Sequence, residues 1–274
     1  FGSLPVADIT TPLVLRVLEP IWTTKTETAS RVRGRVEKIL DWCKTQGYRT
    51  GDNPAAWRGH LENLLSAPQK TKKVEHHPAL PWREIGAFMQ ALRTMPGTAA
   101  LATEFIILTN CRTSEAIEAR WAEIDIGEKR WTIPASRMKA AKEHTIPLSD
   151  AALAVLQRLK AETKEGEFVF PGGKKNTPLS NMACLALLMR LGRSDLTVHG
   201  FRSSFRDWAG EATAHPREVI EHAMSHQLKD KAEAAYQRGS LLERRRVLMA
   251  DWANYCAQPT VTGVVVPLQS AKSA

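Results

Sequence analysis

The chain has 274 residues, enough for one large domain or two modest ones. Lys and Arg outnumber Asp and Glu by 38 to 29, which gives a formal net charge of +9. A basic surplus of this size suits a polyanionic partner but does not choose between DNA, RNA and anionic lipid. No apolar run approaches the ~18 residues that span a bilayer, and the start lacks a secretory signal pattern, so we expect no membrane association.

The four cysteines are far apart in sequence and form no C-x-x-C pair. This spacing argues against a zinc site or a disulfide framework, and it favours a reducing cytoplasm. The sequence also contains neither a P-loop nor an acidic cluster of the kind that binds a catalytic metal. We therefore expect a cytoplasmic protein that uses no cofactor and no metal.

The first part of the chain is predicted to be helical. Residues 12–20 predict a short helix that Pro20 ends, and residues 25–46 predict a longer helix. Asn53 and Pro54 are placed to open a third helix that runs to about Leu65, because Asn is a good N-cap and Pro suits the first turn. Residues 1–65 are thus expected to form one helical domain.

Two faces are expected on the predicted helix 25–46. An apolar stripe recurs at helical spacing and consists of Val32, Val36, Ile39, Leu40 and Cys43. Arg31, Arg35 and Lys38 gather on another face, about 110° around the helix at ~100° per residue. A solvated basic face is one interpretation, and in this chain we favour a surface that faces DNA.

Residues 66–80 break the helical pattern. They are polar, include two prolines, and carry Lys70, Lys72 and Lys73. This composition predicts an interdomain linker, and its positive charge would let it follow a phosphate backbone.

The remainder is predicted to be mainly α with a small antiparallel β-sheet. Helices are expected at 81–95, 98–109, from about Thr113, 150–163, 180–191, 201–211, 216–224, 229–236 and 240–256. Three short strands are expected at Glu123–Ile126, Arg130–Pro134 and His144–Pro147. Residues 81–257 would then form a second domain, and 258–274 a C-terminal tail.

Four segments of this second part contain residues suited to phosphoryl transfer. Residues 108–116 read LTNCRTSEA and contain Arg112 and Glu115, but R-x-x-E spacing also occurs at Arg16 and Arg120 and is common in helix ion pairs. Residues 137–142 read RMKAAK and place Lys139, with Lys142 close by, between two predicted strands. A lysine in such a turn is ordinarily just solvated.

The other two segments contain histidines. His199 and Arg202 form the only H-x-x-R in the chain, within TVHGFRSSFRDW, and at i, i+3 on a helix start their side chains share a face. His226 lies ten residues before Tyr236, and His222 is an alternative to it. A lone histidine at a helix end is more often structural than catalytic.

Together these segments resemble the motif boxes of tyrosine recombinases, specifically phage and genomic-island integrases, and the resemblance covers most of the chain. It implies a nucleophile at Tyr236, phosphate binding by Arg112 and Arg202 with His226, and proton transfer by Lys139 and His199. It further implies that Glu115 orients Arg112. Lys142 remains an alternative to Lys139, His222 and Gln227 remain alternatives to His226, and Arg137 is expected to contact a phosphate.

The resemblance also implies partners, a mechanism and a location at the bacterial nucleoid. Double-stranded DNA with attachment sites would be bound by a homotetramer, assisted in some systems by DNA-bending accessory proteins, and cut through a 3′-phosphotyrosine. Residues 1–65 resemble only part of the family's core-binding domain, so we expect a fragment without the N-terminal arm-binding region. Relaxation of DNA in the manner of a type IB topoisomerase, and DNA binding without catalysis, are the competing functions.

Overall fold

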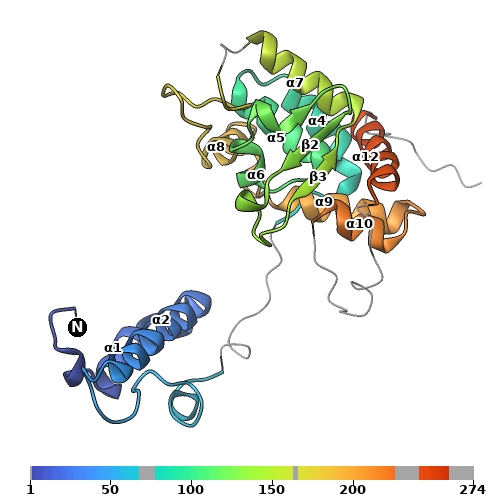
Figure 1. Ribbon diagram of the computed structural model, residues 1–274. Helices are drawn as coiled ribbons and strands as arrows, with labels where there is room; N and C mark the ends of the chain where they lie inside the picture. Colours follow the sequence, from blue (N-terminus) through green and yellow to red (C-terminus); the bar gives the residue numbers. More distant parts are fainter. Residues whose placement is uncertain (1, 68–77, 163–165, 226–240, 259–274) are drawn as a thin grey trace, which may run out of the picture. The chain divides into compact units, whose positions relative to one another are not determined.

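The computed structural model of the chain (Figure 1) describes residues 2–67, 78–162, 166–225 and 241–258. The chain divides into two compact units, Phe1–Glu75 and His76–Ala274. Each unit buries its own set of apolar side chains.

In the N-terminal unit, helices α1 (Thr11–Trp22) and α2 (Thr26–Thr45) pack against each other. Short 3-10 helices lie at Val6–Asp8 and Leu61–Asn63. The core of this unit includes Leu18, Leu40 and Leu61, each at most 1% exposed.

Two of the helix predictions for this unit are wrong. Pro20 lies inside α1, which continues to Trp22 because that side chain is buried and its indole Nε1 donates to the Ser66 carbonyl at 2.9 Å. Residues 53–65 form turns and one 3-10 helix rather than a third α-helix. Asn53 does cap, but its Oδ1 accepts from the Ala55 amide while its Nδ2 donates to the carbonyl of Glu37 on α2.

Helix α2 matches its predicted length but not all of its predicted apolar stripe. Leu40 and Cys43 are buried, and Val32 and Val36 pack against the core, whereas Ile39 is 57% exposed. Ile39 sits at the edge of the stripe, and α2 packs mainly against α1 in the described part of this small unit.

The C-terminal unit is mainly helical. In the described residues its α-helices are α4 (Ile85–Arg93), α5 (Thr98–Thr109), α6 (Thr113–Ile117), α7 (Asp150–Glu162), α8 (Ala183–Arg190), α9 (Gly200–Ala212), α10 (Arg217–Ala223) and α12 (Leu242–Ala257). Short 3-10 helices lie at Trp82–Glu84, Trp121–Glu123 and Ala135–Arg137. The predicted helix at 229–236 falls outside the described residues.

Helix α5 is the centre of this unit. All of its residues from Ala100 to Thr109 are buried, and it contacts α4, α7, α8, α9 and α12. A helix that is apolar on every face must be enclosed on every face. The Trp252 indole of α12 also donates to the Ile107 carbonyl at 2.8 Å, which fixes α12 against α5.

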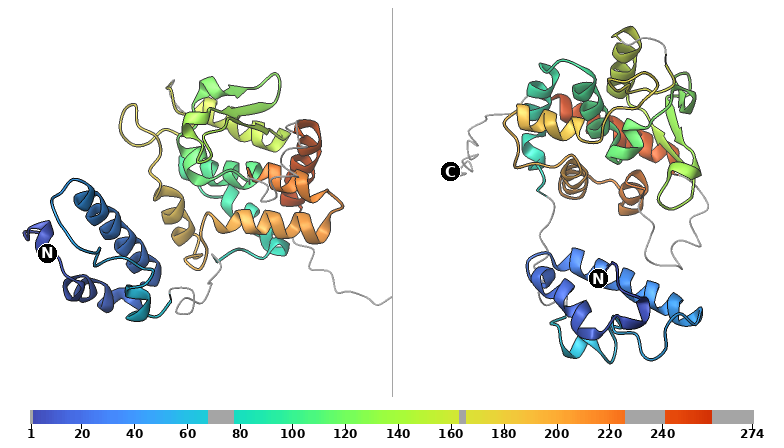
Figure 2. Two further views of the ribbon diagram at one scale, coloured as in Figure 1. Left: turned by 60° about the horizontal axis from the view of Figure 1, so that its bottom comes forward. Right: turned by 90° about the vertical axis from the view of Figure 1, so that its left-hand side faces the viewer.

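The sheet has three antiparallel strands in the order β1 (Ile124–Asp125), β2 (Arg130–Ile133) and β3 (His144–Pro147). In β2, Trp131 and Ile133 point into the core while Arg130 and Thr132 point outward, the alternation expected of a sheet with one covered face. Helix α12 lies beside β3 and α10 in Figures 1 and 2, and it contacts both. The predicted fold class is confirmed.

Candidate functional site

Arg112 follows a sharp turn at the end of α5. Asn110 ends that helix in the left-handed region with φ of 52°, and Arg112 occupies the position before α6. The Glu115 side chain, 4% exposed, accepts from the Arg112 guanidinium at 2.7 Å and from its backbone amide at 2.8 Å. The expected Arg112–Glu115 pair is therefore present, and the buried carboxylate fixes the direction of the arginine.

Arg202 comes from the first turn of α9 and is 4% exposed. Its guanidinium donates to the carbonyl of Asn110 and, at 2.6 Å, to the carbonyl of Met224. These carbonyls end α5 and α10, and the C-terminal end of a helix attracts a cation. Burial, followed by the charge of Arg112, lowers the pKa of Arg202.

The two arginines meet at the end of α10. Arg112 Nη2 lies 3.5 Å from the Ser225 carbonyl, next to the Met224 carbonyl that Arg202 binds. The structure thus brings together two residues that are 90 positions apart in sequence. Two adjacent cations repel each other, and an anion placed between them would relieve that repulsion.

His199 lies at the start of α9 and is exposed, so it differs from its motif partner Arg202 in accessibility. The Arg202 amide donates to the His199 carbonyl at 3.1 Å, which keeps both residues within one helical turn. Gly200 between them has no room for a side chain, because a Cβ there would collide with the Pro78 carbonyl and lie 3.0 Å from Ala79 Cα.

Lys139 and Lys142 are both exposed in the turn between β2 and β3. Neither forms a hydrogen bond or an ion pair with any residue in the described part of the chain. The geometry therefore leaves both available to reach a ligand and does not choose between them.

Arg137 forms several hydrogen bonds within the C-terminal unit. Its side chain is 13% exposed, and its guanidinium donates to Glu123 and to the Glu115 carbonyl, each at 2.6 Å. These bonds tie the start of the hairpin turn to the helix that carries Glu115. Arg137 therefore has a structural role within this unit, and its expected contact with a phosphate stays a prediction.

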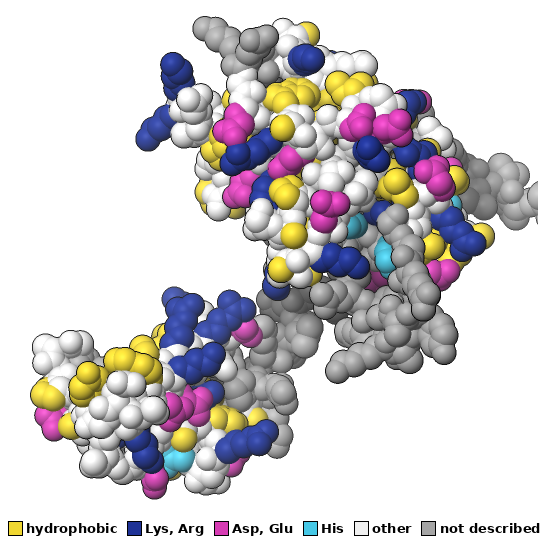
Figure 3. Space-filling view, in the orientation of Figure 1, with side chains coloured by type: hydrophobic (Ala, Val, Ile, Leu, Met, Phe, Trp, Pro, Cys, Tyr) yellow, Lys and Arg dark blue, Asp and Glu magenta, His cyan; other side chains and the backbone are white. Residues whose placement is uncertain are grey.

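Several expected site residues fall outside the described residues, namely His226, Tyr236, Lys70, Lys72 and Lys73. His222, the rival of His226, lies in the last turn of α10 and is half-buried. In the N-terminal unit, Arg31 pairs with Glu27 at 2.9 Å, while Arg35 and Lys38 are exposed. In Figure 3 several Lys and Arg side chains lie together at the upper edge of this unit, and others lie on its lower part.

Sequence reasoning missed His144, the first residue of β3. Its ring is half-buried, and its Nε2 atom is buried without a hydrogen-bond partner among the described residues. Burial, followed by the charges of Arg245, Arg112, His222 and Arg202, lowers the pKa of His144 to about 3. Residues two apart in a strand share a face, and Ile146 is buried. This alternation was the signal that His144 points inward.

Arg245 was missed as well. It is 2% exposed in α12, it donates to the Thr145 carbonyl of β3 at 2.7 Å, and burial lowers its pKa to about 10. The signal was available, because Leu241, Arg245, Leu248 and Trp252 follow helical spacing and place this arginine on an apolar face.

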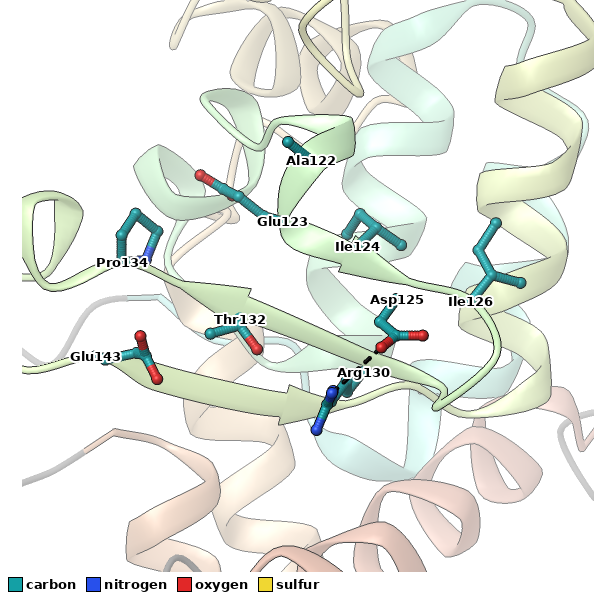
Figure 4. Close-up of a pocket in the computed structure, with 9 residues that line it drawn as sticks. All are labelled: Ala122, Glu123, Ile124, Asp125, Ile126, Arg130, Thr132, Pro134 and Glu143. Carbon is teal, nitrogen blue, oxygen red and sulfur yellow. Dashed lines mark hydrogen bonds and ion pairs between the residues drawn. The ribbon is translucent and has the colours of Figure 1, made fainter.

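A shallow groove of about 710 Å³ lies on the sheet, lined by side chains from β1, β2 and the residue before β3 (Figure 4). It contains three acidic side chains, Glu123, Asp125 and Glu143, and Asp125 pairs with Arg130 at 3.3 Å. Neither arginine of the candidate phosphate site lines this groove. Its acidic lining is poorly suited to DNA.

In the described residues, no group of three or more His, Cys, Asp or Glu side chains is arranged to hold a metal ion. None of the described helices is both long enough and apolar enough to cross a bilayer.

Comparison with known proteins links both units to one family. Residues 1–60 match the phage integrase central domain, and residues 79–239 match the phage integrase family. Prophage integrase IntA of Escherichia coli K12 is 32% identical over 258 residues, which cover 92% of this chain and 60% of that protein. The integrase of Enterobacteria phage P4 is 30% identical over 274 residues, covering 93% of this chain and 61% of the relative.

Solved structures show the same fold. A lambda integrase (75–356) dimer bound to a COC′ core site superposes with a TM-score of 0.62 at 21% identity, covering 83% of this chain and 82% of that one. The Tn1549 transposon integrase in complex with circular intermediate DNA gives a TM-score of 0.56 at 13% identity, covering 86% and 88%. The present chain spans about three fifths of the length of the curated relatives it matches. Since the family match extends over more than half of the chain, the protein belongs to the phage integrase family of tyrosine recombinases.

Proposed function

We propose that this protein is a site-specific DNA recombinase that cuts and rejoins double-stranded DNA through a 3′-phosphotyrosine at Tyr236. The observation that carries the proposal is the meeting of Arg112 and Arg202 at the end of α10. Two guanidinium groups beside each other, one buttressed by a buried carboxylate, form a receptor for a phosphate that gains negative charge in the transition state.

In this mechanism the Tyr236 oxygen attacks the scissile phosphorus, and the bond to the 5′ oxygen breaks. Arg112 and Arg202, assisted by His226, bind the nonbridging oxygens. Lys139 donates a proton to the leaving 5′ oxygen, and His199 accepts the proton of the tyrosine. The 5′ hydroxyl of a partner strand then attacks the phosphotyrosine and restores a phosphodiester, so the reaction needs no added energy source.

The same proposal extends to partners and domains. The names of the relatives include prophage and phage integrases, and solved neighbours include a lambda integrase tetramer bound to a Holliday junction. We propose that this chain likewise acts on DNA attachment sites as a homotetramer. Residues 1–65 would bind DNA as part of a core-binding domain, 66–80 would link it to the catalytic domain 81–257, and 258–274 would form a tail.

Trapping of a covalent complex tests the proposed activity. We expect wild-type protein to form a protein–DNA adduct, visible on a denaturing gel, with nicked suicide duplexes tiled across the DNA that flanks its gene. Tyr236→Phe should bind these duplexes in a gel-shift assay yet form no adduct. Arg112→Ala should slow adduct formation roughly 10²- to 10³-fold while retaining most of the DNA affinity.

Arg120→Ala is the matched control for the arginine variant. It shares the R-x-x-E spacing with Arg112, but its partner is Glu167 and both side chains are exposed. We expect its cleavage rate to equal that of the wild type. An adduct that persists in Tyr236→Phe, or no adduct from wild-type protein on any tiled duplex, contradicts the proposal.

A further inference from the structure

The hairpin turn that carries Lys139 and Lys142 is attached to the rest of the molecule on either side of these residues. On the first side, Met138 is 6% exposed and Arg137 donates to the Glu115 carbonyl. Within the turn, the Ala141 amide donates to the Met138 carbonyl at 2.9 Å. The lysines between these attachments are exposed, so the position of their ammonium groups depends on where the turn is held.

The second attachment begins at His144, where the chain enters β3. His144 pairs with Ile133 across the sheet, and the next carbonyl, that of Thr145, accepts from the buried Arg245. The charges of Arg112 and Arg202, together with those of His222 on α10 and Arg245 on α12, act on the imidazole and help to lower its pKa. His144 is thus two residues from Lys142 along the chain, and the charges of the arginine pair act on its ring.

The environment of this imidazole is unusual for a structural residue. Its Nε2 atom is buried and has no hydrogen-bond partner in the described part of the chain. Leaving a buried polar atom unpaired costs about 1–3 kcal/mol in a folded protein, and such atoms concentrate at functional sites. An apolar side chain would fill this place at lower cost if packing were its only role.

We propose that His144 is a positioning residue for the proton donor of the hairpin: its ring sets the distance between the Lys139–Lys142 turn and the phosphate held by Arg112 and Arg202. The inference rests on the recombinase function proposed above. A lysine that is displaced by even about 1 Å protonates its target much less often, and such misplacement can cost on the order of 10²-fold in rate.

A change of leaving group separates this role from general support of the fold. When sulfur replaces the bridging 5′ oxygen, the tyrosine oxygen still bonds to phosphorus, and the P–S bond breaks with its electron pair on sulfur. A thiol has a pKa of ~8.5, so the thiolate leaves without being protonated. A hydroxyl such as that of water has a pKa of ~15.7, so the 5′ oxygen needs a proton when it leaves. A defect in proton donation therefore disappears on the sulfur substrate, and a defect in phosphate binding persists.

The experiment measures single-turnover adduct formation by the full chain on matched 5′-oxygen and 5′-sulfur nicked duplexes. We expect His144→Ala to be slowed roughly 10- to 100-fold on the oxygen substrate and only a few-fold on the sulfur substrate. Lys139→Ala or Lys142→Ala, whichever residue is the donor, should show the same relief. Arg112→Ala should be slow on both substrates.

Two further variants keep the test decisive. His144→Asn removes only the Nε2 end of the side chain, and it carries the comparison if thermal melting shows that His144→Ala does not fold. His215→Ala removes a histidine that pairs with Asp251 at 2.8 Å outside this site, and both of its rates should match the wild type.

The quantity that decides is the ratio of the sulfur rate to the oxygen rate. A folded His144 variant whose ratio equals that of the wild type overturns the inference. Failure of the wild type to form an adduct on either substrate would instead overturn the recombinase proposal, so the two failures are distinguishable.

Discussion

Single residues in this protein carry charge into buried positions. Arg202 and Arg245 are 4% and 2% exposed, and each is held by backbone carbonyls. Carbonyl oxygens compensate a buried guanidinium without neutralising it, so the positive potential around the arginine pair is preserved. A neutral His144 fits this environment because a further cation would be repelled by the arginines already there.

The depressed pKa of His144 predicts a dependence of stability on pH. An unfolded imidazole titrates near ~6.5, whereas in the folded protein the pKa is about 3. Between these values the unfolded chain binds a proton that the folded chain does not, so the free energy of unfolding falls as pH falls below ~6.5. His144→Gln should lose less stability between pH 7 and pH 5 than the wild type, by about 2 kcal/mol.

Urea unfolding at the two pH values measures this difference directly. All other titrating groups are shared by the two proteins, so the difference between their losses of stability reports the titration of His144. Equal losses of stability in His144→Gln and the wild type would show that the folded imidazole titrates normally.

At the scale of elements, the start of α9 joins the candidate site to the segment that leads into the C-terminal unit. The Thr197 amide and the Ser204 hydroxyl donate to the carbonyls of Pro78 and Leu80, and Gly200 lets the two backbones approach closely. His199 and Arg202 lie on either side of that glycine. The close approach therefore fixes the start of the helix that presents both residues.

We predict that Gly200→Ala lowers the free energy of unfolding by about 1–3 kcal/mol, because the added methyl meets backbone atoms that cannot move aside. Gly210→Ala in the same helix is the matched control. That glycine is exposed, and a Cβ there meets nothing within 4 Å, so alanine should stabilise α9 by roughly 0.5–1 kcal/mol. Thermal or urea unfolding of both variants checks the signs, and a neutral Gly200→Ala contradicts the close approach.

In the hairpin, sequence analysis predicted the strand bounds well but not the tertiary contacts of its residues. Strand β3 has the predicted bounds, and β2 differs by one residue. The alternation of side chains fixes those strands locally. The partners of Arg137 lie on α6 and on the 3-10 helix Trp121–Glu123. The charges that act on His144 come from α9, α10, α12 and the residue before α6, and no periodicity of the hairpin itself reveals them.

At the scale of the whole molecule, two units with separate cores favour a division of labour. The C-terminal unit contains the arginine pair, and the N-terminal unit presents Arg35 and Lys38 on exposed α2 positions. We expect the N-terminal unit to add affinity for DNA and the C-terminal unit to supply the chemistry.

Removing Arg35 and Lys38 together should weaken DNA binding and reduce the slope of log affinity against log salt by about 1.8, since each phosphate contact contributes ~0.9. Lys25 and Lys44 are the matched control pair. Lys25 precedes the helix and Lys44 lies in its last turn, and both point at least ~80° around the helix axis from Arg35 and Lys38, so their double alanine variant should keep the wild-type slope. Fluorescence anisotropy at several salt concentrations measures both slopes, and equal slopes in the two double variants would remove the assignment of this face to DNA.

The sequence by itself determined the fold class, most helix and strand positions, and the motif residues that identify the family. These properties depend on local spacing, which a linear pattern records. It wrongly predicted a helix end at Pro20, an α-helix at residues 53–65 and a buried Ile39. At these positions packing within a small unit outweighed local preference. Only the tertiary structure decided that Arg112 and Arg202 meet at the end of α10, that Arg137 bonds to Glu115 and Glu123, and that the charges of both arginines act on His144. Such contacts join residues that are distant in sequence, and long-range packing rather than local propensity determines them.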